Sequence, residues 1–147
     1  MKVSQVMTSE PACCLPQDSV DIAARLMRIQ DVGMIPVVEG ENVPKLVGVL
    51  TDRDLAVLVV APGREPRKTK VSEVMTTNVV ACHENDPVEL ALDSMKSHQI
   101  RRIPVVSNGK GVVGVVSQSD IALRLHDTET TGDIVAEISK PTTDTEN

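Results

Sequence analysis

Residues 46–54 read Leu46-Val47-Gly48-Val49-Leu50-Thr51-Asp52-Arg53-Asp54, and residues 112–120 repeat the pattern as Val112-Val113-Gly114-Val115-Val116-Ser117-Gln118-Ser119-Asp120. Each run begins with β-branched and aliphatic residues around a glycine, which predicts a short strand. A hydroxyl residue then ends the strand, and a carboxylate follows three residues later, as at the first turn of a helix. The chain therefore contains the same strand-to-helix junction twice.

The repetition extends over most of the chain. Val3-Ser4-Gln5-Val6-Met7-Thr8 returns 68 residues later as Val71-Ser72-Glu73-Val74-Met75-Thr76. The same spacing aligns residues 20–27 with residues 88–95, and both stretches place apolar residues at the i, i+3, i+4, i+7 positions of an amphipathic helix. It also aligns Met34-Ile35-Pro36-Val37-Val38 with Arg102-Ile103-Pro104-Val105-Val106, a second short strand. Each copy therefore predicts the order strand, helix, strand, strand, helix.

These elements predict an α/β (α+β) fold with two small mixed sheets and flanking helices. The first strands are expected near residues 12–15 and 79–82, and the last helices at 52–60 and 118–125. Asp18 and Asp86 precede the first helix of each copy and are predicted to be N-caps. The predicted boundaries are repeat 1 at 1–62, a linker at 63–70, repeat 2 at 71–127, and a polar tail at 128–147 with an apolar patch at 134–138 suited to a short helix.

Composition restricts the partners of such a fold. The core must be aliphatic, because the 147 residues include no Phe, Tyr or Trp. Proteins that grip single-stranded nucleic acid stack bases on aromatic rings, and a formal charge of −6 opposes attraction to phosphate backbones and anionic membranes. The first residues lack an apolar signal core, and no apolar run approaches the ~20 residues of a membrane span. We expect a cytoplasmic protein that binds neither nucleic acid nor a membrane.

The cysteines do not form a recognisable framework. Cys13, Cys14 and Cys82 are odd in number and lack metal-finger spacing, so buried free thiols are expected. Cys13 and Cys14 are the candidate metal ligands that this pattern leaves, with three histidines elsewhere in the chain. Neither Cys-x-x-Cys nor His-x-x-x-His spacing occurs, so we expect no bound metal and no catalytic thiol.

The two junctions have two interpretations. A Ser/Thr-x-x-acid pattern is a capping box, in which the hydroxyl and the carboxylate satisfy backbone amides at the start of a helix. The same place also suits a nucleotide, because a helix N-terminus attracts phosphate and an aspartate accepts the hydroxyls of a ribose.

The surrounding residues favour the second interpretation. Two tandem copies of helix, x-x-Ile-Pro-Val-Val, and Gly-Val-hydrophobic-(Thr/Ser)-x-x-Asp resemble a pair of CBS domains over residues 3–125. The resemblance is closest to small stand-alone bacterial proteins made of one such pair. It implies two pseudo-two-fold βαββα units, a disc-shaped homodimer whose parallel or antiparallel arrangement stays open, and adenosine ligands such as AMP, ADP, ATP or S-adenosylmethionine bound between the units.

The resemblance also implies roles for individual residues. Asp54 and Asp120 would hold the ribose hydroxyls, and Thr51 and Ser117 would contact ribose or phosphate. The residues just before each proline, Met34-Ile35 and Arg102-Ile103, would border adenine. Pro36 and Pro104 are counted with them as ligand-binding residues. Arg101 and Arg102 occupy positions that contact phosphate in the family, whereas the matching residues of repeat 1 are Gly33 and Met34. A guanidinium binds phosphate through forked, charge-assisted bonds, so a phosphorylated ligand is expected to prefer the site that Arg101 and Arg102 face. Arg53 is either a further phosphate ligand or an exposed helix-start residue.

We therefore expect a regulatory, non-enzymatic sensor of adenosine nucleotides that signals to a separate and unknown effector protein. Two alternatives remain: a Cys/His-dependent metal-binding or redox stress protein, and a dimerisation scaffold that binds no ligand.

Overall fold

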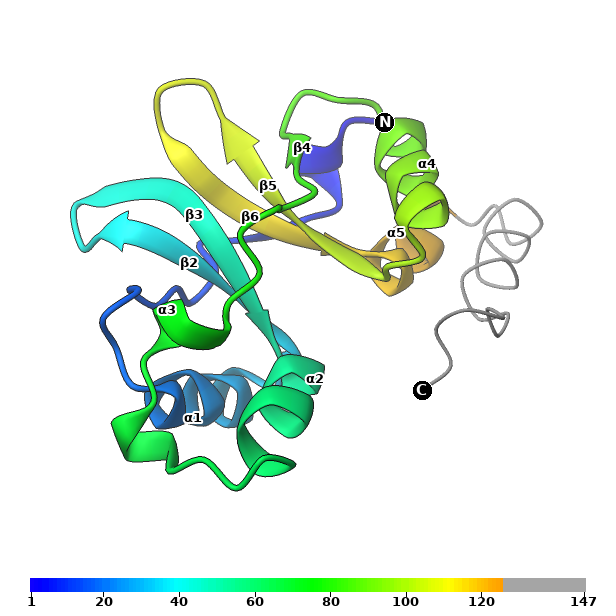
Figure 1. Ribbon diagram of the computed structural model, residues 1–147. Coiled ribbons are helices and arrows are strands. Elements are labelled where there is room, and N and C mark those ends of the chain that lie inside the picture. The colour runs from blue at the N-terminus through cyan, green and yellow to red at the C-terminus, as the bar shows by residue number, and fades with distance from the viewer. Residues whose placement is uncertain (126–147) are drawn as a thin grey trace. The chain divides into compact units, whose positions relative to one another are not determined.

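The computed structural model describes residues 1–125, which form two compact units (Figure 1). The repeat-1 unit comprises residues 10–79 and 106–113, and the repeat-2 unit comprises residues 1–9, 80–105 and 114–125. The expected polar tail at 128–147 and its apolar patch lie outside the described residues. No helix of the described part of the chain is long and apolar enough to cross a membrane.

The repeat-1 unit contains one hairpin and its helices. In chain order, its elements are α1 (Val20–Gln30), β2 (Met34–Gly40), β3 (Val43–Thr51), α2 (Asp52–Leu55), the π-helix η2 (Ala56–Val60), the 3-10 helix η3 (Pro66–Lys68) and α3 (Val71–Val74). β2 and β3 are antiparallel, with Ile35 opposite Leu50. Cys14, in the expected first strand, makes an isolated parallel bridge to Val37 of β2. A parallel neighbour of this kind requires the crossover through α1 that the sequence predicts.

The repeat-2 unit shares the central order of helix, two antiparallel strands and helix with the repeat-1 unit. Its elements are η1 (Val3–Gln5), β1 (Thr8–Ser9), β4 (Cys82–His83), α4 (Val88–His98), β5 (Arg102–Ser107), β6 (Gly111–Ser117) and α5 (Gln118–Leu125), with the tip of the β5–β6 hairpin counted in the other unit. The strands form one sheet in the order β1-β6-β5-β4. The predicted mixed fold of small sheets and helices is confirmed, and its core is aliphatic, with Ile35, Leu50, Leu92 and Ile103 fully buried.

The predicted N-caps of the first helices are wrong. Asp18 accepts a hydrogen bond from the backbone N–H of Leu15, and Asp86 accepts one from the N–H of His83, both at 2.9 Å. Each aspartate therefore closes the turn before the helix, as short carboxylates often do. The N-cap residues are Ser19 and Pro87.

The segments that begin each sequence repeat fold into the unit of the other repeat. Residues 1–9 belong to the repeat-2 unit, where Val3 N–H donates to the carbonyl of Asp86 at 2.9 Å and β1 pairs with β6. Residues 71–79 belong to the repeat-1 unit, where Val71 N–H donates to the carbonyl of Asp18 at 2.8 Å. The central strand glycines accommodate these segments, because a Cβ on Gly114 would lie 2.5 Å from Met7 Sδ.

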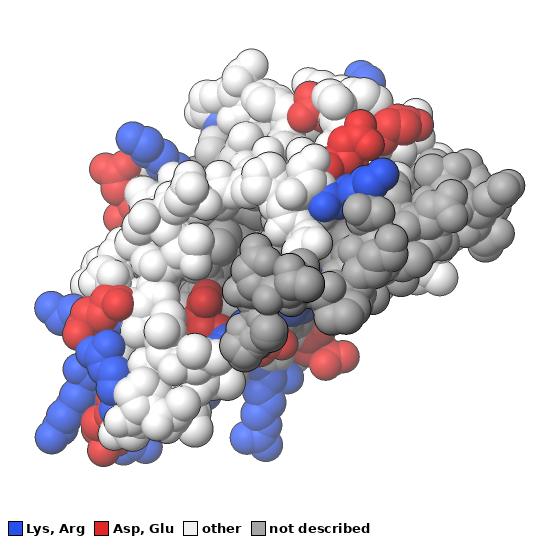
Figure 2. All heavy atoms as spheres, turned by 45° about the vertical axis from the view of Figure 1, so that its right-hand side comes forward, with Lys and Arg blue, Asp and Glu red and all other residues white. Residues whose placement is uncertain are grey.

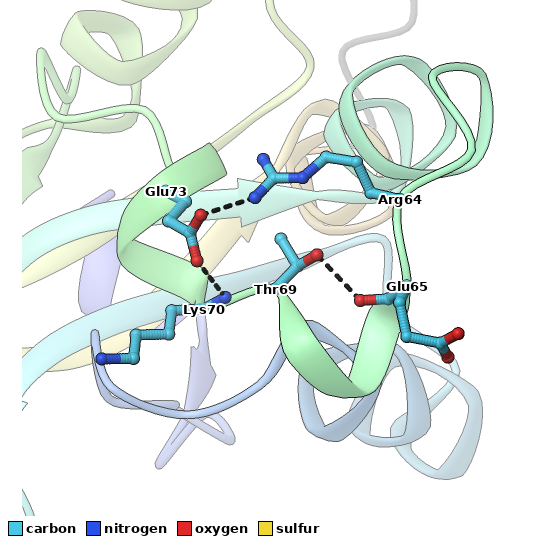
Figure 3. Close-up of polar contacts among 5 residues, drawn as sticks. All are labelled: Arg64, Glu65, Thr69, Lys70 and Glu73. Atoms are coloured by element: carbon cyan, nitrogen blue, oxygen red, sulfur yellow. Dashed lines mark hydrogen bonds and ion pairs between the residues drawn. The ribbon is translucent and has the colours of Figure 1, made fainter.

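The linker between the repeats, residues 63–70, is called the connector below. Polar contacts within the repeat-1 unit hold it in place. Figure 3 shows that the carboxylate of Glu73 joins both ends of the connector, accepting from Arg64 Nη2 at 2.5 Å and from the backbone N–H of Lys70 at 2.7 Å. Thr69 Oγ1 donates to the carbonyl of Glu65 at 2.8 Å, and Thr69 is only 2% exposed. The connector therefore holds α3 in place as well as linking the repeats.

Candidate functional site

The first junction of β3 with α2 is a complete capping box. The backbone N–H of Asp54 donates to Thr51 Oγ1 at 3.1 Å, and the N–H of Thr51 donates to Asp54 Oδ2 at 2.9 Å. Both residues are half-buried. This closure satisfies two amides that a helix start would otherwise leave without partners.

The second junction, of β6 with α5, has the same geometry. Asp120 N–H donates to Ser117 Oγ, and Ser117 N–H donates to Asp120 Oδ2, both at 3.1 Å. These cap bonds engage only Oδ2 of each aspartate, and a carboxylate has two oxygens with about four acceptor positions. Capping therefore leaves each carboxylate able to accept further hydrogen bonds.

The residues at the start of β2 and of β5, which include the predicted site residues Met34 and Arg101, lie next to these junctions. Asp52 N–H donates to the carbonyl of Gly33, and Gln118 N–H donates to the carbonyl of Arg101, both at 2.9 Å. Met34 lies opposite Thr51 in the register of β2 and β3. The start of β2 and the start of β5 therefore each meet the helix start of their own unit.

The residues predicted to border adenine are largely buried. Ile35 belongs to the core cluster of the repeat-1 unit, and Ile35 and Ile103 have no exposed surface. Met34, Pro36 and Pro104 are also buried. The interactions of these residues with a ligand stay a prediction.

The two junctions differ in charge. Arg101 is exposed and Arg102 is half-buried at the second junction, while Gly33 and Met34 stand at the matching positions of the first. Arg53 is exposed on α2, between Asp52 and Asp54. Arg101 and Arg102 therefore distinguish the start of β5 from the start of β2. The face shown in Figure 2 carries both acidic and basic side chains.

Gln118 was not singled out from the sequence. It begins α5 and is only 9% exposed, and its Oε1 has no hydrogen-bond partner among the described residues. Its counterpart in repeat 1, Asp52, is exposed. Aligning the two repeats shows that Gln118 stands where repeat 1 has the charged Asp52. The sequence gives no indication that the side chain of Gln118 is buried.

The cysteines are free and poorly suited to thiolate chemistry. Burial, with the nearby charge of Asp18, raises the pKa of Cys14 to about 12, and burial with the charge of Asp86 raises the pKa of Cys82 to about 12. Burial also raises the pKa of Cys13. Within residues 1–125, no three His, Cys, Asp or Glu side chains are grouped as metal ligands. His126, one of the histidines considered above, lies outside the described residues.

Comparison with known proteins gives the relatives of this chain. CBS domain-containing protein YhcV of Bacillus subtilis is 41% identical over 137 residues, which are 93% of this chain and 94% of that protein. The crystal structure of Hypoxic Response Protein I with two coordinated zinc ions is 30% identical, with a TM-score of 0.76 over 85% of this chain and 99% of that one. The CBS domain pair of protein MJ0100, in complex with 5′-methylthioadenosine and S-adenosyl-L-methionine, is 29% identical, with a TM-score of 0.74 over 88% of this chain and 98% of that one.

The family assignment rests on both repeats. The CBS domain model matches residues 3–61 and again residues 71–127. These two matches contain both capping boxes and both strand pairs described above. The chain belongs to the CBS domain family and carries two copies of the domain in tandem.

Proposed function

We propose that this CBS domain pair is a regulatory, non-enzymatic module that binds an adenosine ligand, AMP, ADP, ATP or S-adenosylmethionine, at its strand-to-helix junctions. The observation that carries the proposal is the duplicated hydroxyl-and-carboxylate box, with Asp54 and Asp120 each half-buried beside a helix start. A relative of similar length, the MJ0100 domain pair, is described as binding S-adenosyl-L-methionine and 5′-methylthioadenosine.

The carboxylates supply the ribose specificity in this proposal. Each aspartate uses Oδ2 to cap its helix, and its remaining acceptor capacity suits the two O–H donors of a ribose. A hydrogen bond to an ionised acceptor is stronger than one to a neutral acceptor, so loss of the carboxylate should weaken binding markedly. Thr51 and Ser117 hold the loops in position for this contact.

The arginines supply the phosphate preference. The second junction has Arg101 and Arg102, and the first has Gly33 and Met34 at these positions. We assign AMP, ADP or ATP to the second junction and expect the first to favour a ligand without phosphate, such as S-adenosylmethionine. Binding can signal to an effector protein only if the ligand's affinity differs between two conformations of the module.

A spectrum of the purified protein gives the first test. Because the chain has no Trp or Tyr, an absorbance band near 260 nm would reveal co-purified adenine directly. Thermal-shift titration with each ligand follows, since a ligand at 100 times its dissociation constant stabilises the folded state by about 2.7 kcal/mol. Absence of a shift with all of these ligands would contradict the proposal.

Substitutions separate ligand binding from capping. Asp120→Ala should lower the melting temperature and also abolish the ADP shift, whereas the exposed neighbour Ser119→Ala should preserve both. An Asp120→Ala protein that is less stable but keeps the full ADP shift would show that this carboxylate only caps its helix. Arg102→Ala should weaken ADP more than adenosine, and equal losses would exclude its phosphate role.

A metal-dependent function is the second candidate, because Hypoxic Response Protein I is described with two coordinated zinc ions. The described residues of this chain offer no matching ligand cluster, so we do not assign zinc to it. Metal analysis of the same purified sample tests this candidate.

A further inference from the structure

The side chain of Gln118 carries a buried hydrogen-bond acceptor that the described structure does not use. Gln118 is the first residue of α5, and only 9% of it is exposed. Its Oε1 has no hydrogen-bond partner within residues 1–125. Buried polar atoms are almost always hydrogen-bonded, because an unpaired acceptor loses its bonds to water and gains none in return. We therefore expect at this atom a donor that the described residues do not supply.

This amide lies within the second strand-to-helix junction. The backbone N–H of Gln118 donates to the carbonyl of Arg101 at 2.9 Å, and Gln118 stands between Ser117 and Asp120 of the capping box. α5 packs beside α4 (Figure 1). Ile121, three residues after Gln118 and therefore on the same side of α5, has no exposed surface. The amide of Gln118 therefore lies on the buried side of the helix start.

The first junction has no equivalent buried acceptor. The matching residue, Asp52, is exposed, and its Oδ1 accepts from the backbone N–H of Arg53 at 2.9 Å. A glutamine keeps a strong acceptor at this position without burying a charge, which would cost far more. Both junctions form complete capping boxes, so the helix start does not require a buried amide. The buried acceptor is therefore a property of the second junction and not of the repeated fold.

The chemistry of an adenosine nucleotide leaves one donor for this acceptor. The phosphate oxygens accept hydrogen bonds, and the donors are the two ribose hydroxyls and the 6-amino group of adenine. In the function proposed above, on which this inference rests, the carboxylate of Asp120 binds the two hydroxyls. The residues of repeat 2 expected to border adenine begin at Arg102, directly after the residue whose carbonyl Gln118 binds. The 6-amino group therefore matches Oε1 in chemistry and in expected position.

We propose that Gln118 makes the second junction specific for adenine, with its Oε1 accepting a hydrogen bond from the 6-amino group. Guanine and hypoxanthine carry a carbonyl oxygen at this ring position and so would place one acceptor against another. A buried site built to hydrogen-bond a ligand rejects an analogue that lacks the donor, because the polar group of the site then stays unpaired. The first junction, where Asp52 is exposed, discriminates less between these bases.

Calorimetric titration of the full-length chain with ADP and with inosine diphosphate tests the proposal. Both ligands carry the same ribose and phosphates, and phosphorylated ligands are assigned to the second junction. The wild type should bind ADP about tenfold or more tightly than inosine diphosphate. Gln118→Met, which keeps the length of the side chain but has no amide acceptor, should weaken ADP and bring the ratio of the two affinities close to one. Ser119→Ala, at the exposed next residue, is the matched control and should preserve the ratio.

The melting temperature of the ligand-free protein separates recognition from a structural role. Gln118→Met removes a buried acceptor that has no partner within residues 1–125, so this variant should melt no lower than the wild type. If Oε1 instead binds an internal water that holds the helix start together, Gln118→Met should melt lower and keep the wild-type affinity ratio. That combination would overturn the proposal.

The titrations also distinguish failure of this inference from failure of the proposed function. A wild type that binds neither diphosphate would overturn both. A wild type that binds ADP and inosine diphosphate equally, or a Gln118→Met protein that keeps the wild-type preference for ADP, would overturn only the role of Gln118 and leave the nucleotide site in place. Loss of the preference in Gln118→Met, but not in Ser119→Ala, is the result expected.

Discussion

Gly114→Ala should loosen the pairing of the first residues of the chain with β6. A Cβ at this position would lie 2.5 Å from Met7 Sδ and 2.9 Å from the carbonyl oxygen of Thr8. The sulfur ends a flexible side chain and can move away. The carbonyl belongs to β1, in which Ser9 pairs with Gly114 itself. The added methyl group must therefore displace the backbone of β1.

The expected cost follows from two opposing terms. Forcing an extra methyl group into a packed interior costs about 1–3 kcal/mol. Replacing glycine with alanine also reduces the conformational entropy of the unfolded chain, which stabilises the folded state by about 0.4–1 kcal/mol. A net loss of about 0.5–2 kcal/mol corresponds to a fall in melting temperature of about 1–8 °C for a chain of this size.

Thermal unfolding followed by far-UV circular dichroism measures this change without Trp or Tyr fluorescence. Gly40→Ala is the control, because the nearest atom to its added Cβ would be Val43 Cβ at 3.8 Å, an ordinary contact. Adding Met7→Ala to Gly114→Ala should relieve the sulfur contact but not the carbonyl contact, and so should not restore wild-type stability. If Gly114→Ala melts no lower than Gly40→Ala, the tight packing of residues 1–9 against β6 is disproved.

Other predictions concern the cap, the thiols and the connector. Thr51→Ala should lower the urea midpoint by the equivalent of about 1 kcal/mol, and Thr51→Ser should lower it less, since only alanine removes the capping hydroxyl; equal midpoints for both would argue against the cap. Because burial raises the pKa of Cys14 to about 12 in the folded protein, its stabilising contribution is fully present below the unfolded-state pKa and is lost as the pH rises above it toward 12. Iodoacetamide at mildly alkaline pH should therefore label Cys14 slowly in the native protein and rapidly in urea, and rapid native labelling would contradict its burial. The pKa of Glu73 is lowered by the backbone N–H of Lys70 and by Arg64, so its contribution is present above the unfolded-state pKa and is lost as the pH falls through the folded pKa. Glu73→Gln should make the urea midpoint less sensitive to acid, by a small amount because the carboxylate is exposed, and an unaltered acid dependence would show that the contact contributes nothing.

The local features of this fold were predictable because they depend on near neighbours. The hydrogen bonds of the capping box join residues three apart, so Thr51 with Asp54 and Ser117 with Asp120 are visible in the sequence. The spacing of apolar residues likewise predicted the helices α1 and α4, and the short runs of β-branched residues predicted the β2–β3 and β5–β6 hairpins. The N-cap prediction failed at Asp18 and Asp86 because a carboxylate can close a turn with the residue three before it as readily as it can cap a helix.

Only the tertiary structure places the leading segments. Residues 3–8 and 71–76 are nearly the same motif, so either one would suit either repeat by composition. Their positions depend on contacts distant in sequence, such as Met7 against Gly114 and Thr76 paired with Val49. The same holds for the exposed apolar side chains of Ile29 and Leu58, since periodicity shows which helix positions are apolar but not which of them a neighbouring element covers. The sequence by itself determined the duplication, the aliphatic core and the two caps, all of which follow from composition or short spacing, whereas the exchange of segments and the exposure of Ile29 and Leu58 arise from packing between distant parts of the chain.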